Sequence, residues 1–256
     1  MKRTLWIAFG VYNVGLELDS FLKNLGKASV KIEKSGINVQ WLAIDDGSND
    51  EVTLNILKKY SRDLIIVKHN KNLGVVQGLL SAMKFIIKNS NESDFMAWLD
   101  SDGEHDPHKL ICALNKVRGG FDIALTQIRY RLSHLSYIDH CFNKFMGAIQ
   151  GEVILGGDKK FLHNCPGCWA VKVSLIKKIF PIFIKYTSFF QDKTGIPMRW
   201  GEDMTVLKII DYLGGKIDVD NVFWSKVSAP NRSTDKIIRQ SLNNLNHLNL
   251  YGEFFV

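Results

Sequence analysis

Short apolar runs alternate with longer amphipathic segments along the first half of this 256-residue chain. The amphipathic segments have the period of about 3.6 residues that is typical of helices, whereas the apolar runs have the length of strands. The predicted strands are Leu5–Val11, Val39–Ile44, Leu64–Lys68, Phe95–Leu99 and Phe121–Thr126. Because such alternation builds right-handed βαβ units, we predict an α/β fold with a mainly parallel sheet flanked by helices.

Hydrophobic residues make up 46% of the chain, which is enough to bury one large core in a single extended domain. The formal net charge of +7 favours anionic partners such as nucleotides, lipid phosphates or nucleic acid. Because the basic residues are spread along the chain, we do not expect nucleic acid as a partner. Four cysteines do not make a disulfide framework in a chain of this size, and this indicates a reducing compartment.

The N-terminal stretch MKRTLWIAFGVYN imitates a secretory signal, because two basic residues precede a mostly apolar run. It lacks a small-x-small cleavage site and turns polar at Tyr12 and Asn13, so a buried first strand is the preferred interpretation. No run of about 18 apolar residues occurs, and we expect no bilayer-spanning helix. We expect a cytoplasmic protein, with peripheral contact at the cytoplasmic membrane face left open.

Small, amide or acidic residues follow four of the predicted strands, where a core would contain none. These stretches are GVYN, DDGSND, HNKNLG and DSDGEHDP. Ligands of parallel α/β sheets bind at the carboxyl ends of the strands. We therefore expect the four stretches to contribute to one shared site.

The fourth stretch places four carboxyl groups within seven positions: Asp100, Asp102, Glu104 and Asp106. Like charges at this spacing repel one another unless a cation or a polar partner stabilises them. Oxygen ligands of this kind suit a divalent cation such as Mg²⁺ or Mn²⁺. The alternative is an Asp-rich turn, in which Asp106 caps a helix that begins at Pro107.

The order of the stretches GVYN, IDDGSND, NKNLG, LDSDGEHDP and GEDMTVLKI resembles the family 2 glycosyltransferases of the GT-A fold, whose sheet is Rossmann-like. The resemblance covers almost the whole chain. Within that family, the stretches DSDGEHDP, GFDIALTQIRYR and NCPGCWAVKVSLI look most like the polyprenyl-phosphate (dolichyl-phosphate) sugar synthases. The resemblance implies one domain, with a nucleotide-binding half over residues 1–115 and an acceptor-side half over residues 116–256.

The family implies inverting sugar transfer from a UDP- or GDP-linked donor with help from a divalent metal. A metal would offset the charge on the departing nucleoside diphosphate. By resemblance to the DXD motif, Asp102 is a metal ligand, Asp100 contacts ribose or metal, and Glu104 is a third metal contact.

The resemblance also implies a set of donor-binding residues. Either Asp45 or Asp46 accepts a hydrogen bond from the base or ribose, and Tyr12 lies against the base. Gly10 stands where the family usually has proline. Ser48 and Asp50 are alternative caps of the next helix. Asn72 and Gly74 are implied at the donor, with a simple helix cap as the alternative. Arg129 and Arg131 follow the fifth predicted strand, where related enzymes place basic side chains near phosphates, and exposed surface charge is their alternative.

Glu202 and Asp203 begin a late helix with an apolar stripe. By resemblance both are catalytic, with Asp203 as the general base for an acceptor hydroxyl. Acids in a first helical turn also favour the helix dipole, which is the alternative. If the acceptor is a lipid phosphate, no base is needed and Asp203 would position the acceptor or a basic side chain.

Two further patterns in the sequence imitate other functional motifs. Cys165 and Cys168, with His163, imitate a redox or zinc motif, but no second ligand pair lies near them in the sequence. The stretch KIFPIFIKYTSFF mixes basic and aromatic residues as a membrane-contacting edge would, and core packing is the preferred interpretation.

Three other functions stay open beside transfer to a polyprenyl phosphate. The first is transfer to a saccharide or protein hydroxyl, and the second is a nucleotide-sugar-binding module without catalysis. Nucleotidyl transfer is the third and weakest, because no glycine-rich phosphate loop of the usual kind follows the first predicted strand.

Overall fold

The computed structural model describes residues 2–103, 105–129, 149, 152–153, 168–224 and 246–255. These residues form a seven-stranded sheet in the order β3-β2-β1-β4-β6-β5-β7. The strands are β1 (Thr4–Val11), β2 (Asn38–Asp45), β3 (Leu64–Lys68), β4 (Phe95–Leu99), β5 (Ile123–Arg129), β6 (Cys168–Lys172) and β7 (Ile217–Trp224). The predicted mainly parallel α/β sheet and its first five strands are therefore confirmed, although β5 begins two residues later than expected.

The sequence pattern did not predict β6 and β7. Strand β6 pairs antiparallel with both β4 and β5, whereas β7 is parallel to β5. Because β6 runs in the opposite direction, its first residue, Cys168, pairs with Leu99 at the end of β4. The beginning of β6 thus lies at the same edge of the sheet as the carboxyl ends of the parallel strands.

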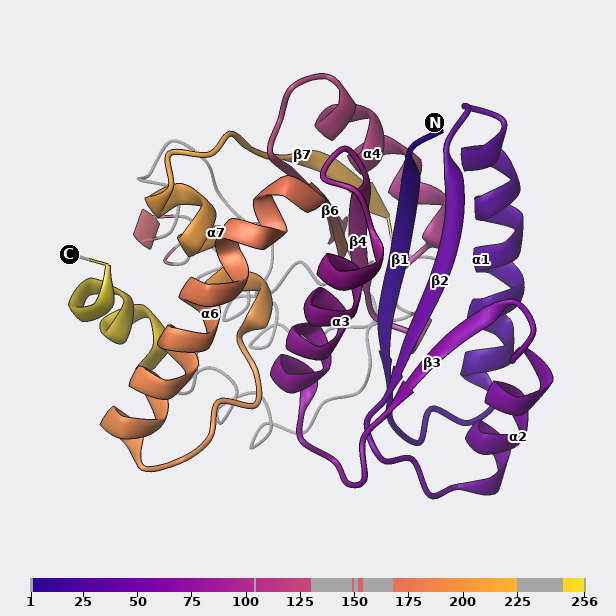
Figure 1. Cartoon of the computed structure of the whole chain (residues 1–256), viewed down its shortest axis with the longest axis horizontal. Coiled ribbons are helices and arrows are strands. Elements are labelled where there is room, and N and C mark those ends of the chain that lie inside the picture. The colour runs from indigo at the N-terminus through magenta and orange to yellow at the C-terminus, as the bar shows by residue number, and fades with distance from the viewer. Residues whose placement is uncertain are drawn as a thin grey trace.

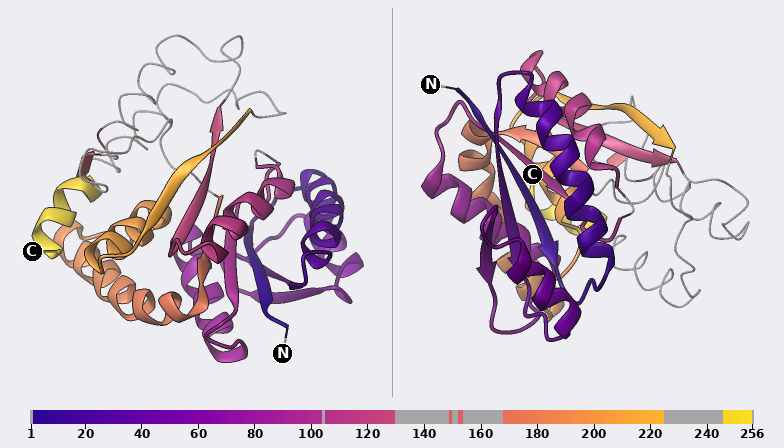
Figure 2. Two further views of the ribbon diagram at one scale, coloured as in Figure 1. Left: turned by 90° about the horizontal axis from the view of Figure 1, so that it is seen from above. Right: turned by 90° about the vertical axis from the view of Figure 1, so that its right-hand side faces the viewer.

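Two layers of helices enclose the sheet because its residues alternate between two apolar cores (Figures 1 and 2). Leu5, Ile7 and Phe9 pack on the side of α1 (Glu17–Glu33), α2 (Glu51–Lys59) and α4 (Leu110–Arg118). Trp6 and Ala8 pack on the side of α3 (Val75–Asn89), α6 (Val173–Thr194) and α7 (Glu202–Tyr212). This alternation is the period of a strand that is buried on both faces.

The stretch that combines basic and aromatic residues lies in α6 and is part of the core. Ile179, Phe183, Tyr186 and Phe190 are buried, which confirms the preferred interpretation of core packing. A helix over residues 246–254 packs against α6, and the rings of Tyr186 and Tyr251 lie 5.1 Å apart (yellow in Figure 1). Among the described residues, no helix combines the length and the apolar character that crossing a bilayer requires.

Candidate active site

The loops that follow β1 and β2 are joined by Asn13. Its Oδ1 accepts hydrogen bonds from the backbone N–H groups of Asn49 (2.9 Å) and Asp50 (3.2 Å). Its own backbone N–H donates to the Ser48 hydroxyl at 3.2 Å. Tyr12 lies beside this junction with 47% of its surface exposed, so its ring is accessible to a ligand.

Asp45 ends β2 and is almost fully buried. Its Oδ1 accepts a hydrogen bond from Ser48 N at 2.8 Å, and its Oδ2 lies 3.7 Å from Lys68 Nζ. The turn continues through Gly47 with φ +77°, and a Cβ at Gly47 would lie 2.6 Å from the carbonyl carbon of Lys71. Only glycine fits this close approach of two loops at a positive φ. Asp50 caps α2, since its side chain accepts from Thr53 N at 2.8 Å.

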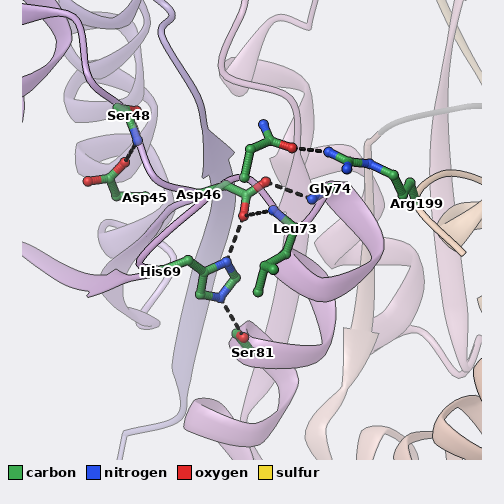
Figure 3. Close-up of polar contacts among 9 residues, drawn as sticks. Asp45, Asp46, Ser48, His69, Leu73, Gly74, Ser81 and Arg199 are labelled. Atoms are coloured by element: carbon green, nitrogen blue, oxygen red, sulfur yellow. Dashed lines mark hydrogen bonds and ion pairs between the residues drawn. The ribbon is translucent and has the colours of Figure 1, made fainter. Parts of the chain in front are cut away.

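Asp46 uses both carboxylate oxygens within the chain (Figure 3). Oδ1 accepts from Leu73 N at 2.9 Å and contacts His69 Nδ1 at 2.7 Å, and Oδ2 accepts from Gly74 N at 2.8 Å. His69 Nε2 lies 2.9 Å from the Ser81 hydroxyl on α3. Asp46 therefore connects the end of β2 to the loop between β3 and α3. No signal in the sequence singled out His69 or Ser81.

The loop between β3 and α3 also contacts the segment that precedes α7. Asn72 Oδ1 accepts a hydrogen bond from the guanidinium of Arg199. Gly74 is the N-cap of α3, with φ +93°, and a Cβ there would lie 3.0 Å from Arg199 Cβ. The capping alternative for Gly74 is thus realised in the structure. Arg199 was missed because nothing in the sequence marks it except its place shortly before Glu202.

The acidic stretch begins directly at the end of β4. The Asp100 side chain is 41% exposed, and Asp102 is exposed as well. Between them, the Ser101 hydroxyl donates to the Gly10 carbonyl at 2.6 Å and connects the ends of β4 and β1. Asp106 accepts from His108 N at 3.1 Å at the start of a short 3-10 helix, η1 (Pro107–Lys109), which confirms its predicted capping role.

The donor atoms at this strand end fit a divalent cation that keeps water or phosphate ligands. In the part of the chain that the structure describes, no three acidic, histidine or cysteine side chains form a metal-holding group. The two accessible carboxylates Asp100 and Asp102 are the hard oxygen ligands that Mg²⁺ and Mn²⁺ prefer. Glu104, the third predicted ligand, lies outside the described residues. The buried His105 Nδ1 lies 3.7 Å from Asp100 Oδ2, and burial lowers its pKa to about 4.

Glu202 and Asp203 begin α7 and are both buried. Trp169 of β6 donates its Nε1–H to Asp203 Oδ1 at 2.7 Å. Burial raises the pKa of Asp203 to about 6, and the Trp169 hydrogen bond opposes that shift. The pKa of Glu202 lies well above its ordinary value because of burial and the neighbouring charges of Asp203 and Asp100. The acids of α7 and of the β4 end therefore influence one another electrostatically.

The remaining predicted residues lie partly outside the described structure. The backbone of Arg129 ends β5, but its side chain is not among the described groups. Arg131, His163 and Cys165 lie outside the described residues. Cys168 is buried in β6, and burial raises the pKa of its thiol to about 12. Because the thiolate is the reactive form, this protonated thiol is unsuited to redox chemistry.

Solved structures of other proteins match this fold over most of the chain. A mannosyltransferase from Pyrobaculum calidifontis, in complex with GDP-Man and Mn²⁺, matches 96% of this chain and 69% of its own, with 14% identity and a TM-score of 0.56. Residues 1–349 of TarS from S. aureus match 98% of this chain and 70% of their own, with 14% identity and a TM-score of 0.52.

A 4-diphosphocytidyl-2C-methyl-D-erythritol synthase has the same fold. It matches 94% of this chain and 99% of its own, at 6% identity and a TM-score of 0.52. Identities this low establish the GT-A-like fold alone, because one fold supports several chemistries.

The sequence itself identifies the family. A search of curated protein sequences finds no match. The model of glycosyl transferase family 2 matches residues 7–180, which span β1 to the first part of α6 and include the acidic stretch after β4. Because this match covers more than half of the chain, the protein belongs to glycosyl transferase family 2 and is a glycosyltransferase.

Proposed function

We propose that the protein transfers a sugar with inversion from a nucleotide-sugar to an acceptor, with help from a divalent metal. One observation supports this most: Leu99, next to Asp100, pairs with Cys168 at the start of β6, and the next residue of β6, Trp169, donates a hydrogen bond to Asp203. A donor bound at Asp100 would therefore lie at the same edge of the sheet as a carboxylate able to accept a proton. We further propose residues 1–115 as the donor-binding half and residues 116–256 as the acceptor-side half.

In this proposal the donor lies along the ends of β1, β2 and β4. Asp45 accepts a hydrogen bond from the base or ribose, since its Oδ2 makes a long contact of 3.7 Å with Lys68 Nζ, whereas both oxygens of Asp46 accept hydrogen bonds from backbone N–H groups. Tyr12 lies against the base, and Gly10, Asn72 and Gly74 shape the adjacent backbone. Asp102 and Asp100 would hold Mg²⁺ or Mn²⁺, with Glu104 as a third contact. A bound divalent metal would offset the negative charge of the departing nucleoside diphosphate.

For a hydroxyl acceptor, Asp203 is proposed as the general base, whereas for a lipid phosphate it would position the acceptor or a basic side chain. With a pKa of about 6 it is mostly ionised at neutral pH but remains a stronger base than an ordinary aspartate. The hydrogen bond from Trp169 fixes the orientation of its carboxylate. Attack by the acceptor on the face opposite the leaving nucleotide would invert the anomeric carbon. Burial and the neighbouring charges of Asp203 and Asp100 raise the pKa of Glu202 well above its ordinary value, and Glu202 is proposed as a neighbouring acid.

Nucleotide binding is expected to require both metal and Asp102. We expect UDP or GDP to raise the melting temperature in the presence of Mn²⁺, because a ligand that binds only the native state stabilises it. Asp102→Ala removes a ligand carboxylate and should abolish most of the shift. Asp192→Ala, at an exposed position on α6, is the matched control and should behave like the wild type. An unchanged shift for Asp102→Ala would refute the metal assignment.

A polyprenyl phosphate presented at a membrane surface is the acceptor that we favour. The support is the resemblance of DSDGEHDP to the lipid-phosphate synthases, the net charge of +7 and the position of Arg129 at the end of β5. Arg129→Ala should reduce acceptor use more than donor binding. Binding to anionic vesicles should decrease as salt increases, because exposed charges are screened.

The raised pKa of Asp203 favours the second candidate, transfer to a saccharide or protein hydroxyl, because only a hydroxyl needs a base. Asp203→Asn should then reduce turnover by about 100-fold or more with little change in donor affinity. The deciding assay supplies labelled donors with polyprenyl phosphate or with soluble saccharides. Label on saccharides alone would eliminate the lipid acceptor. Donor binding without transfer or donor hydrolysis would instead indicate a binding module without catalysis.

A further inference from the structure

Two segments that lie far apart in the sequence meet beside the proposed donor site. The guanidinium of Arg199, in the connection between α6 and α7, donates to Asn72 Oδ1 across 127 positions of sequence (Figure 3). The Arg199 carbonyl also accepts from Val76 N at 3.4 Å, in the first turn of α3. Side chain and backbone of one residue thus contact both the donor-side loop and the helix that follows it.

The donor-side loop is held firmly on its other side. Asp46 accepts hydrogen bonds from Leu73 N and Gly74 N, and it contacts His69, which in turn contacts Ser81. A Cβ at Gly74 would lie 3.0 Å from both the Cβ and the carbonyl oxygen of Arg199, so the two backbones are already in close contact. The loop cannot shift towards α7 without moving Arg199.

The proposed catalytic turn is equally constrained. Arg199 is separated from Glu202 by only two residues, Trp200 and Gly201. The Gly201 carbonyl accepts from the Thr205 hydroxyl at 2.8 Å, and the ring of His247 lies against Gly201. Asp203 is held by Trp169. A displacement of Arg199 is therefore transmitted over a short, restrained segment to the two acids.

We propose that Arg199 is a positioning residue that couples the donor-side loop at Asn72–Gly74 to the turn that bears Glu202 and Asp203. Filling the donor site restrains the loop, and Arg199 passes that restraint to the proposed base. This inference rests on the proposed function, because it assigns the two segments to donor and base. The planar guanidinium suits the role because its several donors have a fixed geometry, which a lysine ammonium lacks.

Hydrogen–deuterium exchange and kinetics test this coupling. The variants are Asn72→Ala, Arg199→Ala and Arg199→Lys. The matched control is Lys177→Ala. It removes an exposed ion pair of 3.1 Å between Lys177 on α6 and Glu92, which lies between α3 and β4. That ion pair connects the regions of α3 and α6 at another place. In the wild type, UDP or GDP with Mn²⁺ should slow exchange over residues 201–206. In Arg199→Ala and Asn72→Ala that protection should be lost, while Lys177→Ala should retain it.

The kinetic result should separate positioning from a general loss of stability. Arg199→Ala should lower kcat by about 10-fold or more, because a small misplacement of a reacting group is costly. Donor KM should change much less, and Arg199→Lys should recover part of kcat. A fall in kcat that follows the melting temperature across all variants, the control included, would overturn the inference.

The exchange measurement without nucleotide keeps this inference separate from the proposed function. Asn72→Ala should accelerate exchange over residues 201–206 in the ligand-free protein, although it lies far away in sequence, whereas Lys177→Ala should not. If residues 201–206 of the ligand-free Asn72→Ala variant exchange at the wild-type rate, the coupling is refuted, whether or not nucleotides bind. A wild-type protein that binds neither UDP nor GDP with Mn²⁺ would instead refute the proposed function, and accelerated exchange in Asn72→Ala would still support the mechanical connection.

Discussion

At the residue scale, the raised pKa of Asp203 predicts that stability depends on pH. Its pKa of about 6 lies above the ordinary value of 3.8, so the folded state binds this proton more tightly than the unfolded state. The free energy of unfolding should therefore decrease as pH rises from about 4 to about 6. Asp203→Asn keeps an acceptor for Trp169 and loses this titration. Above pH 6 it should be more stable than the wild type by on the order of 1 to 3 kcal/mol. Urea unfolding at pH 4.5, 6 and 7.5, without metal, measures the difference, and a pH-independent difference would contradict the assignment.

At the scale of elements, the turn after β2 and the loop after β3 depend on one glycine. Gly47→Ala should destabilise the protein by more than about 1 to 2 kcal/mol, because a backbone penalty at positive φ adds to a collision with the Lys71 backbone. Gly36→Ala is the matched control, since Gly36 has φ +84° and nothing within 4 Å of the added Cβ. The difference between the two variants in the free energy of unfolding, measured with denaturant, separates the cost of the collision from the cost of the positive φ. Equal losses would show that the two loops can separate without cost.

At the scale of the whole molecule, the regular part of the fold could be predicted and the contacts between distant segments could not. Apolar runs such as Phe95–Leu99 mark a buried strand because burial on both faces excludes polar residues. Strand β6 was not predicted because Cys168–Lys172 is short and continues directly into α6. It also follows a stretch of chain in which the sequence pattern predicted no helix or strand. The acids after β4 and at the start of α7 were identified by the family resemblance. The partners Trp169 and Arg199 were not, because their roles arise only when segments far apart in sequence are packed together.

The reversed direction of β6 has a consequence for how such a protein can diversify. Strand β5 ends, and strand β6 begins, at the edge of the sheet where the proposed donor site lies, because β6 is antiparallel to both of its neighbours. Any stretch of chain that joins those two ends therefore leaves the sheet and re-enters it at the edge where the proposed donor site lies. Insertions, deletions or exchanges between β5 and β6 can therefore occur without changing a single strand pairing. Under the proposed function, such changes would give a lineage new acceptors while the sheet that carries the donor site is inherited unaltered.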